Sequence, residues 1–365
     1  MKRIFVNFVA YHGGGTADAY QMIKALVENN CEVYVVLSKN MENIALWRKI
    51  KGLHIYEVNG YTSKLNFYPR LLKFLLFDLN KIYKKVRSLG ITDMYIPMIS
   101  YWTYYIFRKF KKFRVFYTMH DVRPHDEKTN TIIWKQSELI ANKCSDIIIL
   151  SEFFRKTVIE NYKKTNDRIH VLSLGCQQYY PVKEYKKNSD RFEFVFYGRI
   201  DDYKGLDVLA KAYKIILNDY KDIIHLTIAG SGDFSNYEED FDDIDSNNLT
   251  IINRWIKDEE VYDFFNYEKS ITIIPYKNAT QSGVIPIAMT FNSLVISTNC
   301  AGLSEQVIDN YTGFLIEPNN ANELAEKMIY VINNWDKAKL LSYNAKKYIS
   351  DNSWNNIANK LLEKI

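Results

Sequence analysis

The sequence has few cysteines, and the four that it has stand far apart. They are Cys31, Cys144, Cys176 and Cys300, with no CxxC pair and no histidine at the spacing of zinc ligands. A small disulfide-stapled fold and a structural zinc site are therefore excluded, and this cysteine usage favours a reducing compartment. We expect no metal site in this chain.

Long apolar runs are missing as well. No stretch of about 18 uncharged apolar residues occurs, so we expect no membrane-spanning helix. The first residues do not make a signal peptide, because Asn7 interrupts their apolar run and a His12–Gly15 segment follows where a cleavage region would lie. We expect a cytoplasmic protein, in which any membrane contact is peripheral.

Charge of one sign is not in strong excess, since the net charge is +5 and the aromatic residues do not alternate with basic repeats. Nucleic acid is therefore not expected as a partner. No strand–GxGxxG–helix unit with a following acidic residue is present, which disfavours a dinucleotide oxidoreductase. A chain of 365 residues, 47% of them apolar, is longer than a single hydrophobic core usually serves. The length therefore predicts two domains.

The first half of the chain alternates short β-branched or aromatic runs with longer segments of helical period. This alternation is typical of parallel βαβ units and predicts a doubly wound α/β sheet. The expected strands are Arg3–Ala10, Glu32–Leu37, His54–Val58, Met94–Met98, Arg114–Met119, Asp146–Leu150 and Ile169–Leu172. The expected helices are Ala17–Asn29, Tyr68–Ser88, Ile132–Lys143 and Glu152–Asn161.

A polar stretch at residues 174–191 interrupts this pattern and is interpreted as a linker between domains. A second Rossmann-like series is predicted over residues 192–351. Its expected strands are Phe192–Tyr197, His225–Ile228, Leu249–Ile252, Ile271–Ile274, Leu294–Ser297 and Phe314–Ile316. Its expected helices are Leu206–Leu217, Asp258–Phe265, Gly283–Phe291 and Asn322–Val331. A last helix within 352–365 can pack on either lobe.

The strongest local motif is the segment Phe196–Gly205, which follows one strand and precedes a helix. Gly198 lets the backbone approach a ligand, and Arg199 and Lys204 bring two cations to the end of the strand, where open α/β sheets bind ligands. This combination suits a diphosphate. A basic turn with solvated charges is the alternative interpretation.

A second motif, Pro275–Pro286, also joins a strand to a helix through a polar turn. Free backbone N–H groups at Ser282, Gly283 and Val284 are expected to present the positive end of that helix to a phosphate. A plain helix N-cap at Ser282 explains the same residues.

Four segments occur in the order and spacing of one known family: Gly198–Gly205, Ile228–Gly232, Asn278–Met289 and Ala301–Glu305. Through them the chain resembles the retaining, group 1 enzymes of glycosyltransferase family 4. The resemblance implies a GT-B fold, with two tandem Rossmann-like domains around a deep cleft. It places the acceptor on the N-terminal domain, 1–173, and the nucleotide-sugar on the C-terminal domain, 192–351. It also implies that the helix in 352–365 returns to complete the first domain.

The resemblance also implies roles for individual residues. Arg199 and Lys204 would hold the donor diphosphate and stabilise its departure, while Gly198 lets the backbone approach it. The loop residues that would meet the distal phosphate and the sugar are Gln281, Ser282, Gly283 and Val284. The residues implied beside the nucleobase are Asn253, Arg254 and Trp255.

In the N-terminal half, Gly14 and Gly15 lie in a glycine run like those near the donor phosphate in GT-B enzymes, although such a run also makes a tight turn. His120 resembles the family's active-site histidine near the transferred sugar, with Asp121 to orient it and His125 facing the acceptor. A hydrogen-bonded structural histidine is the alternative for His120.

One departure from the family stands out. The usual pair of glutamates, eight residues apart, aligns with Ala279 and Ile287, and the QSGV form of the loop resembles a known variant of the family. Contacts to the ribose and sugar hydroxyls must therefore differ. Glu305 is a candidate compensating carboxylate, or a residue that only caps the following helix. Loss of activity is the other explanation.

These features lead to one expected function and two alternatives. The expected function is transfer of a sugar, from a UDP-sugar by preference, to a glycan or lipid-linked acceptor in cell-surface polysaccharide synthesis, with no metal and no cofactor. A nucleotide-sugar-binding relative without activity and a sugar-nucleotide epimerase remain open. The apolar and basic residues of 68–88 form either a contact for an anionic membrane or a lobe-packing helix with a solvated edge.

Overall fold

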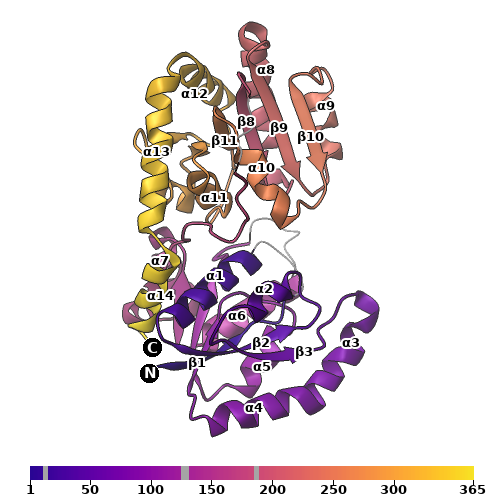
Figure 1. The fold of residues 1–365 in the computed structure, drawn as a ribbon, viewed down its shortest axis with the longest axis vertical. Helices are drawn as coiled ribbons and strands as arrows, with labels where there is room; N and C mark the ends of the chain where they lie inside the picture. Colours follow the sequence, from indigo (N-terminus) through magenta and orange to yellow (C-terminus); the bar gives the residue numbers. More distant parts are fainter. Residues whose placement is uncertain (11–14, 125–130, 185–188) are drawn as a thin grey trace. The chain divides into compact units, whose positions relative to one another are not determined.

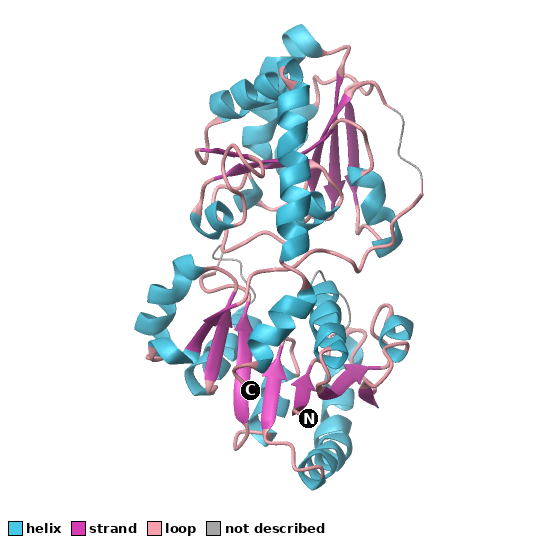
Figure 2. Cartoon of the chain, turned by 60° about the vertical axis from the view of Figure 1, so that its left-hand side comes forward, coloured by secondary structure: helices cyan, strands magenta, loops and turns pink. Residues whose placement is uncertain are grey.

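The computed structural model describes residues 1–10, 15–124, 131–184 and 189–365. The chain divides into two compact units (Figures 1 and 2). The first comprises Met1–Leu174 together with Trp354–Ile365, and the second comprises Gly175–Ser353. Both chain termini lie in the first unit, where the ammonium of Lys2 donates to the carbonyl of Leu362.

The first unit is built on a seven-stranded parallel sheet in the order β3-β2-β1-β4-β5-β6-β7, with helices on both faces. Its strands are β1 (Arg3–Asn7), β2 (Glu32–Ser38), β3 (His54–Val58), β4 (Asp93–Ile96), β5 (Arg114–Met119), β6 (Asp146–Ile149) and β7 (Ile169–Val171). Its helices are α1 (Gly15–Glu28), α2 (Ile44–Arg48), α3 (Lys64–Lys73), the π-helix η1 (Phe74–Asp78), α4 (Leu79–Ser88), α5 (Thr103–Lys109), α6 (Thr131–Lys143), η2 (Glu152–Phe154), α7 (Arg155–Tyr162), η3 (Asn166–Arg168) and α14 (Trp354–Leu362).

The C-terminal helix α14 belongs to the core of this first unit. Trp354, Ile357 and Leu361 lie on one face of the helix and are buried in the same hydrophobic cluster as Met22 and Leu26 of α1. Their spacing of three and four residues produces a single apolar stripe, which explains why so short a helix docks firmly.

The segment expected as one helix, Tyr68–Ser88, begins four residues earlier and is interrupted by the π-turn η1. Its buried residues are Leu71, Phe74, Leu79, Ile82 and Val86. The five-residue step from Phe74 to Leu79 does not fit an α-helix, and the π-turn keeps both side chains on the core face. Phe74 stacks on Trp102 with ring centroids 4.9 Å apart.

The second unit is built on a six-stranded parallel sheet in the order β10-β9-β8-β11-β12-β13. Its strands are β8 (Phe192–Tyr197), β9 (Ile224–Gly230), β10 (Leu249–Asn253), β11 (Ser270–Ile274), β12 (Leu294–Thr298) and β13 (Phe314–Ile316). Its helices are η4 (Asp202–Lys204), α8 (Leu206–Tyr220), η5 (Ser235–Tyr237), α9 (Glu238–Phe241), η6 (Asp258–Glu260), α10 (Val261–Phe265), α11 (Val284–Thr290), η7 (Ala301–Glu305), α12 (Ala321–Asn333) and α13 (Trp335–Asp351).

The two-sheet α/β architecture expected from the sequence is confirmed, and all the expected strands are present with ends that shift by at most a few residues. Among the described residues, four α-helices were not expected: α2, α5, α9 and α13. The longest of them, α13, buries Ala338, Ser342, Ala345 and Ile349. Three of these four side chains are small, so its core-facing side carries few large apolar residues.

Each sheet has a point at which the strand order reverses. In the first sheet it lies between β1 and β4, and in the second it lies between β8 and β11. Open α/β sheets bind their ligands at the carboxyl ends of the strands beside such a switch point. The loops that follow β8 and β11 are therefore the first place to look for a site in the second unit.

Glycines bring the loops at this switch point into backbone contact. Gly198 and Gly230 have φ angles of +125° and +153°, and a Cβ atom at Gly230 would lie only 1.7 Å from the carbonyl oxygen of Gly198. Gly205, with φ +72°, approaches the carbonyl oxygen of Pro275, and a Cβ atom there would lie 2.0 Å away. Residues with a Cβ atom cannot make these contacts without displacing the backbone.

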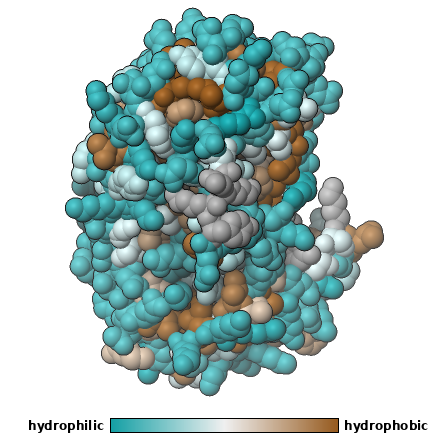
Figure 3. Space-filling model, turned by 45° about the horizontal axis from the view of Figure 1, so that its top comes forward, coloured by the Kyte–Doolittle hydropathy of each residue, from teal (hydrophilic) through white to brown (hydrophobic). Residues whose placement is uncertain are grey.

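The described residues include no helix with both the length and the apolar character needed to cross a membrane. The face drawn in Figure 3 is mostly hydrophilic, with apolar patches between the polar residues.

We predict that Gly230→Ala lowers the free energy of unfolding by about 2–4 kcal/mol, because it combines a disfavoured backbone angle with a backbone clash. Gly283→Ala is the matched control, since a Cβ atom at Gly283 meets open space. Thermal unfolding of the intact protein measures both. Equal unfolding midpoints for the two variants would contradict the prediction.

Candidate donor-binding and catalytic site

The loop from Gly198 to Gly205 carries the two expected cations. Arg199 is 63% exposed, and its Nε lies 3.3 Å from a carboxylate oxygen of Asp201. The ammonium of Lys204 lies over the face of the Tyr276 ring, 3.7 Å from its centroid, and 4.9 Å from that of Tyr203. The negative face of an aromatic ring attracts an ammonium, so these rings fix the position of Lys204.

Tyr276 joins this loop to the one after β11. Its ring is fully buried, and burial raises the pKa of its hydroxyl to about 12. The hydroxyl of Ser282 donates to it at 3.4 Å, and the nearby Arg199 charge acts on it in the opposite direction to burial. Tyr276 therefore stays neutral and presents its ring to Lys204 at ordinary pH.

Lys277 holds the same two loops together, a role that sequence reasoning missed. Its backbone N–H donates to the carbonyl of Tyr203 at 2.8 Å. Its ammonium lies 3.0 Å from Asp207 and 3.3 Å from Asp202. The pKa of Lys277 is raised because these carboxylates outweigh the opposing effect of burial. The charge of Lys277 is thus neutralised within the protein.

The loop between β11 and α11 is held by a side chain distant in sequence. Gln306 accepts from the backbone N–H of Ser282 at 2.7 Å and donates to the carbonyl of Ser282 at 2.9 Å. The hydroxyl of Ser282, in turn, accepts from the N–H of Val284 at 3.2 Å. These three bonds fix the loop before any ligand binds.

This arrangement corrects the expectation of three free amides. The N–H groups of Ser282 and Val284 already have protein partners. Within the part of the chain that the structure describes, Gly283 is the one of the three whose N–H has no partner. Because α11 has only seven residues, its dipole contributes little here. The side-chain amide oxygen of Gln281 is also buried and lacks a hydrogen-bond partner among the described residues.

The two positions that were expected to align with the glutamate pair are parts of the core. Ala279 and Ile287 are buried at 1% and 5% exposure, in the main hydrophobic cluster of the second unit. Glu305 is exposed and is the last residue of η7. No helix follows η7 directly, so the expected helix-capping role for Glu305 is wrong.

Two side chains at the end of β10 and just after it already have partners within the protein. Asn253 accepts from the N–H of Gly232 at 3.2 Å, which ties the ends of β9 and β10 together. Arg254 makes a bidentate pair with Glu260, at 2.9 and 2.6 Å. This pair, with the N–H of Lys257, lowers the pKa of Glu260 to about 2. Trp255 is 48% exposed and offers an apolar surface for a flat ring.

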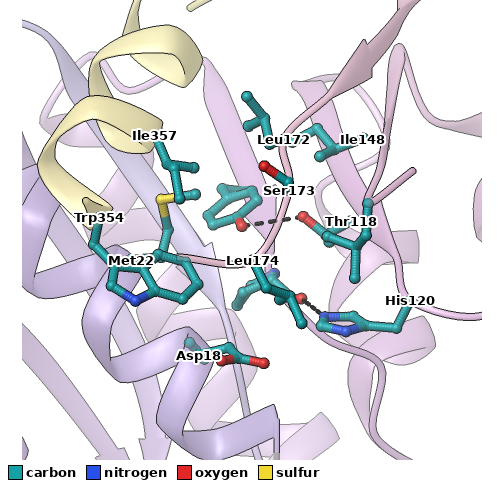
Figure 4. A pocket seen from close by; sticks show the side chains of 14 residues that line it. Asp18, Met22, Thr118, His120, Ile148, Leu172, Ser173, Leu174, Trp354 and Ile357 are labelled. Carbon is teal, nitrogen blue, oxygen red and sulfur yellow. Dashed lines mark hydrogen bonds between the residues drawn. The ribbon is translucent and has the colours of Figure 1, made fainter. Parts of the chain in front are cut away.

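His120 lies in the first unit, at the carboxyl end of β5, and lines a cavity of about 20 Å³ (Figure 4). Its Nε2 lies 2.9 Å from the carbonyl oxygen of Pro97, after β4. A carbonyl only accepts, so neutral His120 carries its proton on Nε2 and has its acceptor at Nδ1. The hydroxyls of Tyr95 and Thr118 lie 3.0 Å apart in the same cavity.

This cavity holds about one water molecule and is too small for a sugar ring. Asp18 of α1 also lines it. Burial, with a smaller effect from the charge of Asp18, raises the pKa of the Tyr95 hydroxyl, which therefore stays protonated. Pro97 also lines this cavity, and its carbonyl fixes the orientation of the His120 imidazole through the hydrogen bond to Nε2.

Two of the other candidates in this unit can be placed. Gly15 is the first residue of α1, and a Cβ atom there would lie 1.7 Å from the end of the Met98 side chain. Asp121 is partly buried next to His120. Gly14 and His125 lie outside the described residues.

In chemical terms, the carboxyl edge of the second sheet presents two cations, one free amide and an exposed aromatic ring. Such a set can bind a diphosphate with an attached planar base. Within the described ranges, no group of three or more histidine, cysteine, aspartate or glutamate side chains is arranged to hold a metal ion.

The fold and this site define a GT-B glycosyltransferase, and comparison with known proteins supports that class. The family model described as glycosyl transferases group 1 matches residues 182–348, and the model described as Glycosyltransferase Family 4 matches residues 12–177. The chain belongs to glycosyltransferase family 4, group 1 type.

Individual relatives agree with this assignment. An uncharacterized glycosyltransferase of Methanocaldococcus jannaschii is 24% identical over 86% of this chain and 76% of its own length. The capsular polysaccharide biosynthesis glycosyltransferase CapM of Staphylococcus aureus is 24% identical over 58% of this chain and 61% of its own. The fold matches that of Anabaena HepE in complex with UDP-glucose, with a TM-score of 0.72, 14% identity and full coverage of both chains.

We predict that Arg254→Ala raises the pKa of Glu260 from about 2 toward its ordinary value of 4.5, because it removes the main hydrogen bond to that carboxylate. Any stability that the pair contributes is present above pH 4.5 and is lost as the pH falls toward 2, and the variant lacks this contribution throughout. Carboxyl NMR titration measures the shift. Lys257→Ala is the control, since it keeps the backbone N–H, and an equal shift in both variants would contradict this assignment.

Proposed function

We propose that this enzyme transfers a sugar, with retention of anomeric configuration, from a UDP-sugar to a glycan or lipid-linked saccharide in cell-surface polysaccharide synthesis. The observation that carries the proposal is the pair of cations, Arg199 and Lys204, on a glycine-shaped loop at the switch point of the second sheet. The UDP-glucose in the HepE structure and the name of CapM support the choices of donor and pathway.

In this proposal the protein itself stabilises the leaving group. Arg199 and Lys204 meet the negative charge that develops on the departing diphosphate, and the N–H of Gly283 and the amide of Gln281 contact the phosphate or the sugar. The exposed ring of Trp255 packs on the base. No metal and no cofactor is needed, because the nucleotide-sugar is a substrate and cations of the protein meet its charge.

His120 is proposed to contact the transferred sugar from the first unit. The Nε2–H of the neutral imidazole donates to the carbonyl of Pro97, so a sugar hydroxyl that contacts the ring would donate to Nδ1. The acceptor hydroxyl attacks on the face that the diphosphate leaves, so no nucleophile of the enzyme takes part. Asp121 follows His120 in the chain and is proposed to position the imidazole.

Two other functions fit the same fold. The absence of the glutamate pair suits a relative that binds the nucleotide-sugar without turnover, and the two-domain architecture also suits a sugar-nucleotide epimerase. The products separate the three. A transferase releases the nucleoside diphosphate, an epimerase returns a changed nucleotide-sugar, and a binding protein does neither.

We predict that the intact protein releases UDP from one member of a panel of UDP-, GDP- and dTDP-sugars, and that EDTA leaves the rate unchanged. Arg199→Ala and Lys204→Ala should each lower kcat/KM about 10–100-fold, the cost of losing one charge-assisted contact to phosphate. Lys211→Ala, an exposed lysine on α8, is the control and should keep the rate. Tight nucleotide binding without turnover, even with lipid-linked acceptors supplied, would contradict the transferase and support a protein that only binds the nucleotide-sugar.

We also propose that α3 and η1 contact the cytoplasmic face of an anionic membrane. Five large apolar side chains of this segment are exposed to solvent: Leu65, Tyr68, Leu72, Leu76 and Phe77 are 93%, 76%, 59%, 56% and 58% exposed. The first four follow steps of three and four residues and so share one face of the helix. This exposed stripe is distinct from the buried stripe that packs on the core.

Basic residues accompany the exposed stripe. Lys73, Lys81, Lys84, Lys85 and Arg87 are all exposed. Cations of this kind attract anionic lipid headgroups, at about 1 kcal/mol for each, while the apolar side chains enter the interface. Charge complementarity therefore favours a membrane over a second copy of the chain as the partner of this stripe.

We predict that Leu72→Glu with Leu76→Glu weakens binding to vesicles of phosphatidylglycerol and phosphatidylcholine at least tenfold, since it places charge where apolar side chains enter the interface. Ile215→Glu, at an exposed isoleucine of α8, is the control. Co-sedimentation at low and high salt measures binding. Unchanged sedimentation would contradict the membrane contact, and a loss of dimers in light scattering would instead identify a second copy as the partner.

A further inference from the structure

The second unit contains a cavity of about 470 Å³ away from the donor loops. Its walls come from the segment that follows Gly175 and from α10, α11 and α13. Thr290 and Asn292 line it at the C-terminal end of α11, whereas Gly283 and Val284 of the donor loop lie at the N-terminal end, about 10 Å away along the helix. The volume falls in the range of small-molecule sites.

Aromatic rings form much of the wall. Tyr180, Tyr262, Phe291 and Tyr343 all line the cavity. The rings of Tyr262 and Phe291 meet edge to face, with centroids 5.0 Å apart and an interplanar angle of 84°, so each holds the other in place. Tyr343, on α13, is 50% exposed and is therefore accessible to a ligand.

Polar groups accompany these rings. Asn292 has a φ angle of +62°, a conformation that asparagine tolerates better than most residues. Its side-chain carbonyl oxygen is buried and has no hydrogen-bond partner among the described residues. A buried acceptor without a donor costs free energy. Rotation of the Asn292 amide toward the cavity would let a ligand that donates a hydrogen bond recover this cost. Lys346 also lines the cavity, and none of the described residues that line it carries a carboxylate.

We propose that this cavity binds a saccharide, the acceptor or product chain of the enzyme, at a site separate from the donor site. The C–H groups of a sugar ring are weakly positive and pack on the negative faces of aromatic rings, while its hydroxyls donate to an acceptor such as Asn292. Lys346 makes the cavity suitable for neutral and acidic sugars. The proposal rests on the proposed function, because that function makes a saccharide chain the substrate.

Such a site would hold a growing chain on the enzyme between transfers. Tethering raises the local concentration of the chain near the donor site, so a second contact favours long acceptors over short ones. The donor residues Arg199 and Lys204 take no part in it, and hydrolysis of the nucleotide-sugar does not need it.

The test uses cellotetraose, tetra-N-acetylchitotetraose and a hyaluronan tetrasaccharide as probes, with the intact protein and saturation-transfer NMR. We expect at least one probe to bind, and saturating UDP not to displace it. Tyr343→Ala should weaken that binding at least tenfold. Tyr348→Ala, on the same helix and 38% exposed but outside the cavity, should change it less than twofold.

Asn292→Gly provides a second variant that keeps the backbone conformation and should also weaken binding. No binding of any probe, displacement by UDP, or an equal loss in the Tyr343 and Tyr348 variants would overturn the proposal. The rate of UDP release separates it from the proposed function. Intact UDP release without probe binding contradicts only this site, whereas probe binding without UDP release contradicts only the transferase.

Discussion

The candidate donor site depends on two backbone contacts that only glycine allows. Gly230 meets the carbonyl of Gly198, and Gly205 meets the carbonyl of Pro275. The first contact brings the ends of β8 and β9 together, and the second brings the loop after β8 against the loop after β11. Arg199, Lys204 and Tyr276 take their positions from these contacts, so the geometry of the cations follows from the absence of two Cβ atoms.

The second constraint is the fixed loop between β11 and α11. Gln306 occupies both backbone groups of Ser282, so this part of the site is preorganised. Ala279 and Ile287 fill the core at the two positions that the sequence alignment assigned to the expected glutamate pair. A carboxylate at either position would have to be buried without an evident partner, at a high cost. Apolar residues at these two positions therefore fit the hydrophobic core that surrounds them.

The sequence predicts much of the fold because most strands are continuous apolar runs. Arg114–Met119 and Phe192–Tyr197 have the predicted ends. The helix α13 was not predicted because its buried face, Ile349 apart, consists of small residues. The π-turn at Phe74–Asp78 was not predicted because its only sign in the sequence is one five-residue step. For the candidate site, the cations can be located from their spacing. The bonds of Gln306 to Ser282 join residues 24 apart, and no local pattern indicates them.

The two lysines of the site differ in what they can offer a ligand. Lys277 lies against the carboxylates of Asp202 and Asp207, which cancel its charge and make it a link between loops. Lys204 lies on the face of Tyr276, which attracts the ammonium through a quadrupole and leaves its positive charge in place. An aromatic ring can thus position a cation without neutralising it. Because two of the three loop amides are already bonded, the proposed binding of a phosphate rests on this charge and on Arg199.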